Sequence, residues 1–138
     1  MLDFSATKTK RRVRRTSTHT FYSTPTASQV AARRALEDGA EWLAASRAHY
    51  QEAGDAAAAR LGVDPPEGGT FLFLDVAEHL DDSGLEGFMH RCMDQNLVLA
   101  PGSSCGSAYG TYVRVCFTSA PPDVVARGVD VLARLLGR

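Results

Sequence analysis

The chain has 138 residues, of which 44% are hydrophobic and 22% are charged, and its formal net charge is −1 at pH 7. This length predicts one domain with a hydrophobic core. No run reaches the roughly 18 apolar residues that a membrane span requires, and no apolar core of a secretory signal is present, so we expect neither.

Positive charge is concentrated near the N-terminus. Up to Arg34 there are eight Lys or Arg and one Asp, whereas the remainder has seven Lys or Arg and fifteen acids. The three cysteines, Cys92, Cys105 and Cys116, form no close pair and cannot all be bridged, which favours a reduced, cytoplasmic protein. The Arg-, Thr- and Ser-rich start resembles an organelle transit peptide only faintly.

Residues 1–17 are predicted to form a basic, disordered or poorly packed arm. Six Lys or Arg lie between Lys8 and Arg15, where they repel one another, and only Val13 offers a group for burial. Such a run can bind phosphates weakly and in a salt-sensitive way. Because neither stacking aromatic residues nor a reading helix is interleaved with it, a solvated tail is favoured and nucleic acid is not expected as a partner.

Residues 18–62 are predicted to form helices that link domains or contact a partner. One helix is expected after Thr24, which can cap it. The Ala-rich run from Glu41 to Leu61 predicts a second helix, ended by Gly62. This second helix has few large apolar groups, so much of it is either solvated or packed against another surface.

Residues 63–138 are predicted to form a small αβ domain, with a short mixed or antiparallel sheet packed by helices. Ser83 and Glu86 are expected to form a capping box at the start of one of these helices. The predicted strands cover residues 70–76, 97–100 and 111–117, and the last helix covers residues 121–136. The fold class is therefore α/β.

One arginine, Arg114, falls inside the third predicted strand. It alternates with Val113 and Val115, so its guanidinium shares a face with Tyr112 and Cys116. Taking a guanidinium out of water without a partner costs several kcal/mol or so, whereas a carboxylate can satisfy its fork geometry with two hydrogen bonds. We therefore consider that a ligand carboxylate binds to this residue.

A ligand is not the only explanation for this arginine. Arg114 can instead lie on an exposed or edge strand, or pair with a protein acid such as Asp75 or Asp94. The loop before the strand favours the ligand, because it contains residues that end a strand or let the backbone pass close to a bound molecule, namely Pro101, Gly102, Gly106 and Gly110.

Four blocks of sequence follow one another in a characteristic order. They are Phe21-Tyr22-Ser23-Thr24-Pro25; Gln29 with Ala31-Ala32 and Ala35-Leu36; Pro66-Glu67-Gly68-Gly69-Thr70-Phe71-Leu72-Phe73-Leu74-Asp75; and Leu99-Ala100-Pro101-Gly102 followed by Tyr112-Val113-Arg114-Val115 and Phe117. Together they resemble the C-terminal part of class I and II aminotransferases, which are pyridoxal-phosphate enzymes of the aspartate aminotransferase fold. The match covers roughly Thr16 to the C-terminus.

The resemblance implies roles for several residues. Arg114 would hold the α-carboxylate of an amino acid or 2-oxo acid substrate, and Tyr22 and Ser23 would lie in a loop that reaches the neighbouring subunit's active site. His19 stands where dicarboxylate-specific members have arginine, so aspartate and glutamate are not expected as preferred amino donors. Lys8 is a weak candidate for the Schiff-base lysine, because the glycine and arginine expected after it are absent and an arm residue is favoured.

The resemblance also implies pyridoxal 5'-phosphate as cofactor, and a homodimer or a complementing cofactor-binding half as partner. We expect the chain not to catalyse transamination alone, because a working site needs an acid and a phosphate cup that no segment supplies. No metal is expected, since no ligand set has the usual spacing. Two alternatives are a non-enzymatic αβ interaction module and part of another pyridoxal-phosphate enzyme of this fold, such as a decarboxylase or an acyl-condensing enzyme.

Overall fold

The computed structural model describes residues 6–20 and 22–138, and these fall into two compact units that meet between Ala44 and Ala45. The division lies within the third helix, whereas the segments expected from the sequence end at residues 17 and 62. Among the residues described, no helix combines the length and the apolar character needed to cross a membrane.

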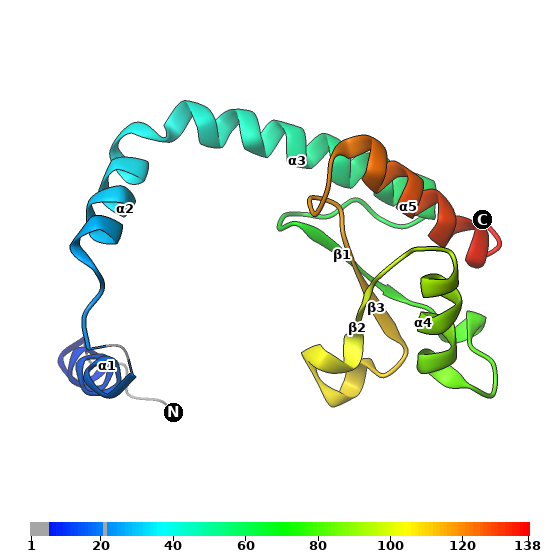
Figure 1. The fold of residues 1–138 in the computed structure, drawn as a ribbon, viewed down its shortest axis with the longest axis horizontal. Helices are drawn as coiled ribbons and strands as arrows, with labels where there is room; N and C mark the ends of the chain where they lie inside the picture. Colours follow the sequence, from blue (N-terminus) through cyan, green and yellow to red (C-terminus); the bar gives the residue numbers. More distant parts are fainter. Residues whose placement is uncertain (1–5, 21) are drawn as a thin grey trace. The chain divides into compact units, whose positions relative to one another are not determined.

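The first unit contains helices α1 (Ala6–Thr20) and α2 (Thr26–Asp38) and the start of α3 (Ala40–Leu61) (Figure 1). From residue 6 onward, the arm predicted to be disordered or poorly packed is a helix, and residues 1–5 of that arm lie outside the described part. Lys and Arg are good helix formers, because their unbranched side chains lose little rotamer freedom in a helix. These local preferences outweigh charge repulsion, although the side chains of residues 8–16 are exposed.

The second unit is built on a three-stranded antiparallel sheet with the order β1-β3-β2 (Figure 1). The strands are β1 (Phe71–Asp75), β2 (Ala100–Pro101) and β3 (Tyr112–Cys116), so β3 is central. The rest of α3, the helices α4 (Gly84–Asp94) and α5 (Pro122–Leu135), and three short 3₁₀ turns complete the unit, which confirms the predicted α/β class. The turns are η1 (Ala77–His79), η2 (Gly102–Cys105) and η3 (Ser107–Tyr109).

One face of this sheet forms the hydrophobic core. The buried strand residues are every second residue, as a sheet with one covered face requires. The second half of α3, α4 and α5 each contribute buried side chains to the same cluster, whose largest members are Phe88, Leu61, Leu132, Val76, Val113 and Cys92. The other face of the sheet is left half-exposed, and it carries the functional candidates.

The strand predicted over residues 97–100 begins later than expected because the residues before it end helix α4. Asn96 has a positive φ of 59°, and the Leu97 N–H donates to the Cys92 carbonyl at 2.9 Å. This is the Schellman arrangement, in which a left-handed residue closes the last helical turn. The backbone of Leu97 is therefore used by the helix rather than by the sheet.

The predicted capping box at the start of α4 is wrong. The Ser83 side chain makes no cap hydrogen bond to the helix, and its hydroxyl donates instead to the Asp81 carboxylate. The same carboxylate accepts the Ser83 N–H at 2.9 Å and forms an ion pair with Arg91. An Asx-type turn around Asp81 thus replaces the reciprocal Ser83–Glu86 arrangement.

Candidate carboxylate-binding site

The open face of the sheet is formed by the side chains of β1 and β3 that point away from the core. On β3 these are Tyr112, Arg114 and Cys116, as the alternation in the sequence predicts, while Val113 and Val115 are buried. Arg114 lies between Phe73 of β1 and Ala100 of β2 in the strand register. It therefore occupies the middle of the sheet, and an edge-strand position is excluded.

The Arg114 side chain is half-buried and lies against an aromatic ring. Its guanidinium carbon is 5.3 Å from the centroid of the Phe71 ring, a cation–π distance. A ring on one face of the planar group restricts its rotation and leaves its N–H edges for a partner. Arg114 also lines a cavity of about 400 Å³ between residues 96–100, β3 and the start of α5.

Neither acid suggested by the sequence pairs with this guanidinium. Within residues 6–20 and 22–138, Arg114 takes part in no ion pair. Asp75 lies opposite Tyr112, and its Oδ1 accepts the Ala77 N–H at 3.0 Å. Hydrogen bonds from the Thr111 side chain, and then from Ala77, hold the pKa of Asp75 below its ordinary value. The acceptor for Arg114 is therefore not supplied by Asp75 or Asp94.

A cluster of three aromatic rings stands beside Arg114 on the same face. The Phe73 and Tyr112 rings are stacked with centroids 4.9 Å apart, and Tyr109 meets Phe73 edge-on at 5.1 Å. The sequence pattern does not predict this cluster as a unit, because Tyr109 comes from the turn η3. The only signal for it was the alternation of aromatic residues in the two strands.

The turn after Pro101 is held close to this face by a glycine. A Cβ added to Gly102 would lie 2.5 Å from the Tyr112 Cβ and 2.7 Å from the Tyr109 carbonyl oxygen, so glycine is required for this approach. The Pro101-Gly102 step thus fixes η2 and η3 against β3, on the strand that carries Arg114.

Cys116, at the end of β3, is exposed and free. Desolvation raises the pKa of its thiol, but hydrogen bonds from Thr118 and Ser119 and the charge of Arg114 outweigh this effect, so the pKa lies below its ordinary value. By contrast, burial raises the pKa of Cys92, a core residue.

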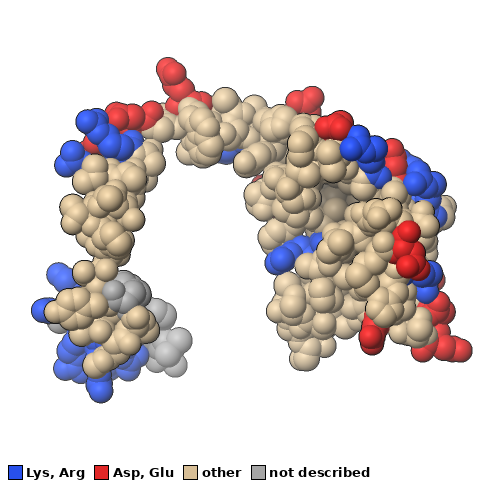
Figure 2. Space-filling model, in the orientation of Figure 1, with Lys and Arg blue, Asp and Glu red and all other residues tan. Residues whose placement is uncertain are grey.

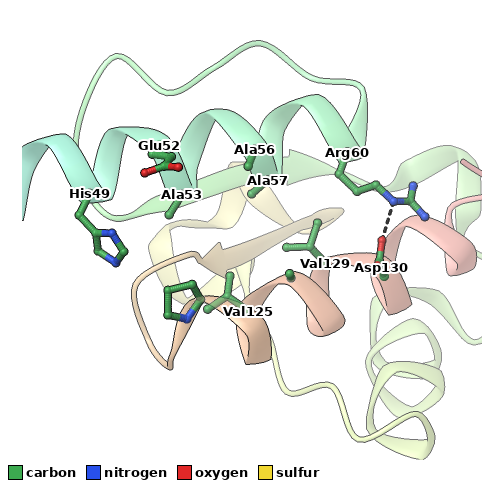
Figure 3. Close-up of a pocket in the computed structure, with 11 residues that line it drawn as sticks. His49, Glu52, Ala53, Ala56, Ala57, Arg60, Val125, Val129 and Asp130 are labelled. Atoms are coloured by element: carbon green, nitrogen blue, oxygen red, sulfur yellow. Dashed lines mark hydrogen bonds and ion pairs between the residues drawn. The ribbon is translucent and has the colours of Figure 1, made fainter.

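A second cavity, also of about 400 Å³, lies between α3 and α5 (Figure 3). Its walls are mainly small apolar side chains, among them Ala53, Ala57 and Val129. The ion pair between the Arg60 Nε and the Asp130 Oδ1, 2.6 Å apart, stands at one end. None of the residues predicted from the sequence to act in binding or catalysis lines this groove.

The other predicted site residues belong to the first unit. Lys8 and His19 are exposed on α1. Tyr22 is 82% exposed with a φ of 60°, and its N–H donates to the Ser17 carbonyl at 2.9 Å. Ser23 follows it in an exposed bend. His19, Tyr22 and Ser23 therefore lie at the end of α1 or just after it, in the first unit. Arg114 lies in the second unit.

The described residues do not fit a complete pyridoxal-phosphate site. The only lysines of the sequence are Lys8 and Lys10, both on the exposed helix α1, and neither lines the cavities beside Arg114 or between α3 and α5. No group of three His, Cys, Asp or Glu able to hold a metal ion is present in that same part of the chain.

Comparison with solved structures identifies the fold. The chain matches the alpha-aminoadipate aminotransferase LysN of Thermus thermophilus, in complex with N-(5'-phosphopyridoxyl)-L-leucine, with a TM-score of 0.78 and 21% identity over 94% of this chain. It matches the kynurenine aminotransferase of Pyrococcus horikoshii, in complex with PMP, with a TM-score of 0.78 and 20% identity, again over 94% of this chain. No protein-family model and no curated protein sequence matches.

The likeness confirms the resemblance at the level of the fold. The chain has the fold of part of an aminotransferase, and it spans 36% and 34% of the two solved chains, about a third of each.

Proposed function

We propose that this chain is the C-terminal, substrate-binding part of a pyridoxal-phosphate aminotransferase, in which Arg114 binds the carboxylate of an amino acid or 2-oxo acid. The observation that carries the proposal is a half-buried guanidinium in the middle of the sheet with no acid paired to it in the described residues. The aminotransferase fold of the matched structures supports it. Amino-group exchange itself is proposed only for the complete assembly.

Arg114 would act by orienting the substrate. Two parallel N–H···O bonds from the guanidinium fix both oxygens of a carboxylate, and with them the direction of the attached Cα. Pairing with strands on both sides holds the Arg114 backbone in place, and the Phe71 ring limits rotation of the side chain. A lysine at this position would offer a single point charge and would not define the carboxylate plane.

The cofactor would be held by a separate part of the assembly, since these residues do not form its site. Exposed apolar side chains near the unit boundary support a protein partner: Leu36 is 88% exposed, Trp42 72% and Leu43 53%. The partner would be a cofactor-binding half or a second copy of the chain, and His19, Tyr22 and Ser23 would lie near that contact. His19 in place of an arginine favours substrates without a second carboxylate, and three free cysteines favour the cytoplasm.

The carboxylate site can be tested in solution with pyruvate as the probe. One charge-assisted pair stabilises a complex by about 1.5–3 kcal/mol, which corresponds to a Kd of about 6–80 mM. We expect the ¹⁵Nε resonance of Arg114 to move saturably with pyruvate at constant ionic strength. Arg114→Lys should abolish the accompanying changes at the Phe71 and Tyr112 amides.

Arg127 of the unmodified chain provides the matched control. Arg127 is exposed on α5, where its Nη1 is 2.7 Å from the Asp123 Oδ2, so its resonance should not saturate with pyruvate. Equal responses from the two arginines would show that binding is non-specific. The purified chain mixed with pyridoxal phosphate, an amino acid and a 2-oxo acid should show no turnover, and sustained turnover would refute the need for a cofactor-binding partner.

A further inference from the structure

Helix α1 is uniformly basic. It carries six Lys or Arg and no acidic residue over Ala6–Thr20, and Lys and Arg side chains gather over it in Figure 2. Lys8, Arg11, Arg12 and Arg15 follow one another at the i, i+3, i+4 and i+7 spacing that places side chains on one helix face. His19 continues this face by one more turn. We define Lys8, Arg11, Arg12, Arg15 and His19 as the basic stripe.

Two further cations lie away from the stripe. Lys10 and Arg14 are four residues apart and, at about 100° per residue, fall roughly on the opposite side of the helix. All six Lys and Arg side chains of α1 are exposed. The helix therefore presents positive charge on two sides.

The arginines of α1 are not neutralised by the protein surface as those of α2 are. In α2, Arg33 lies 3.4 Å from the Glu37 carboxylate and Arg34 lies 3.1 Å from that of Asp38. Across the described ranges, the four arginines of α1 form no ion pair. Their charge is available to an external anion.

The apolar content of α1 favours a nucleic acid over a membrane. Helices that lie in a bilayer surface need a broad apolar face opposite their charges. Here Val13, 62% exposed, is the largest apolar side chain of the helix, and the remaining residues are mostly Thr and Ser. A phosphate backbone needs only the positive charge.

We propose that α1 is a docking surface for the backbone of double-stranded DNA, independent of the carboxylate site. A helix with its side chains is about 10–12 Å across, and the major groove of duplex DNA is about 12 Å wide. A helix in that groove faces phosphates on both sides, which matches the basic stripe on one side and Lys10 and Arg14 on the other. The contacts are to the backbone, so sequence preference is weak.

The sequence alone favours a solvated tail here, because it predicts no helix within the basic run. The structure shows a helix over Ala6–Thr20. Once the run is helical, its charges acquire a fixed spacing along about 16 Å, at 1.5 Å per residue from Lys8 to His19.

The test is fluorescence anisotropy of a labelled 30-base-pair duplex titrated with the full chain between 50 and 200 mM KCl. If four phosphates are contacted, the slope of log K against log salt is about −3.6, so the affinity falls about 150-fold over this range. In the triple variant Arg11→Gln, Arg12→Gln, Arg15→Gln, the slope should fall to about −1, and binding at 50 mM salt should weaken at least tenfold.

A matched control removes three positive charges from outside α1. The variant Arg33→Gln, Arg34→Gln, Arg47→Gln has the same net charge as the triple variant of α1. It should keep the salt slope of the unmodified chain. Circular dichroism should show equal helix content in both variants, because Gln is a good helix former.

Four outcomes would overturn the proposal. They are an absence of binding at 50 mM salt, an equal loss of binding in the two triple variants, binding to phosphatidylserine-containing vesicles with no binding to the duplex, and salt-sensitive self-association of the chain in place of duplex binding.

Discussion

Replacing Gly102 with alanine should destabilise the second unit and disturb the face that carries Arg114. The added Cβ would meet the Tyr112 Cβ at 2.5 Å and the carbonyl oxygens of Tyr109 and Tyr112 at 2.7 Å. These are backbone atoms and a Cβ, which cannot move away as the end of a flexible side chain can. The turns η2 and η3 must therefore shift away from β3.

The loss of folding free energy in Gly102→Ala can be estimated from other substitutions that overpack a site. Such substitutions cost about 1–3 kcal/mol. In a unit of the size of Ala45–Arg138, each 1 kcal/mol lowers Tm by about 4–8 °C, so a cost of about 2 kcal/mol predicts a fall of about 8–16 °C. The described residues of α2 include no buried side chain, so cooperative melting reports mainly on the second unit.

Gly110→Ala is the control, because Gly110 lies in the same loop, has a φ of −64° and has open space where a Cβ would stand. It should leave Tm unchanged or raise it slightly. The assay is thermal denaturation followed by circular dichroism, with urea denaturation as a second measurement. If Gly102→Ala melts within 2 °C or so of the unmodified chain, or if Gly110→Ala loses as much stability, the close packing of η2 and η3 against β3 is refuted.

Two further predictions follow from the pKa shifts. Iodoacetamide at pH 7.5 should modify Cys116 well before Cys92, because Cys116 is exposed and has a lowered pKa, whereas Cys92 is buried and has a raised pKa. Mass spectrometry of time points measures the order of modification. Equal rates for the two thiols in the folded chain would contradict the prediction. Hydrogen bonds from Ser83, and to a lesser extent the charge of Arg91, lower the pKa of Asp81, so its contribution to stability is present above about pH 4 and is lost as the pH falls through the lowered value. The difference in urea midpoint between the unmodified chain and Asp81→Asn should therefore shrink below pH 4, and a difference that grows with acid would be inconsistent with this.

The sequence was sufficient for features that depend on local patterns. Alternation around Arg114 predicted which β3 side chains are buried, because a sheet with one covered face imposes a period of two. The left-handed Gly62, with a φ of 62°, ends α3 as expected, since the Val63 N–H donates to the Ala58 carbonyl at 3.0 Å.

Features that depend on competition between partners were not predictable in the same way. The Ser83 N–H had two possible acceptors, the carboxylates of Glu86 and Asp81, and it donates to Asp81, which lies within the same tight turn. The apolar side chain of Leu97 favours a strand, yet the Leu97 N–H closes helix α4. In both cases the residue type is compatible with the predicted structure and with the observed one, and the local backbone conformation determines which hydrogen bond forms.

The candidate site shows the same division. The position of Arg114 follows from sequence spacing. The Phe71 ring lies 5.3 Å from the Arg114 guanidinium because of the strand register, and Tyr109 reaches the Phe73 ring from a distant turn, so the sequence did not predict either contact. The helical state of the N-terminal basic run was missed because charge repulsion was weighed above helix propensity.

The most direct test of the central claim is a crystal structure of the chain soaked with pyruvate. The account predicts a carboxylate with both oxygens within hydrogen-bond distance of the Arg114 guanidinium, beside the Phe71 ring. A guanidinium paired instead with an acid of its own chain, or a pyruvate bound only elsewhere, would contradict the proposed function.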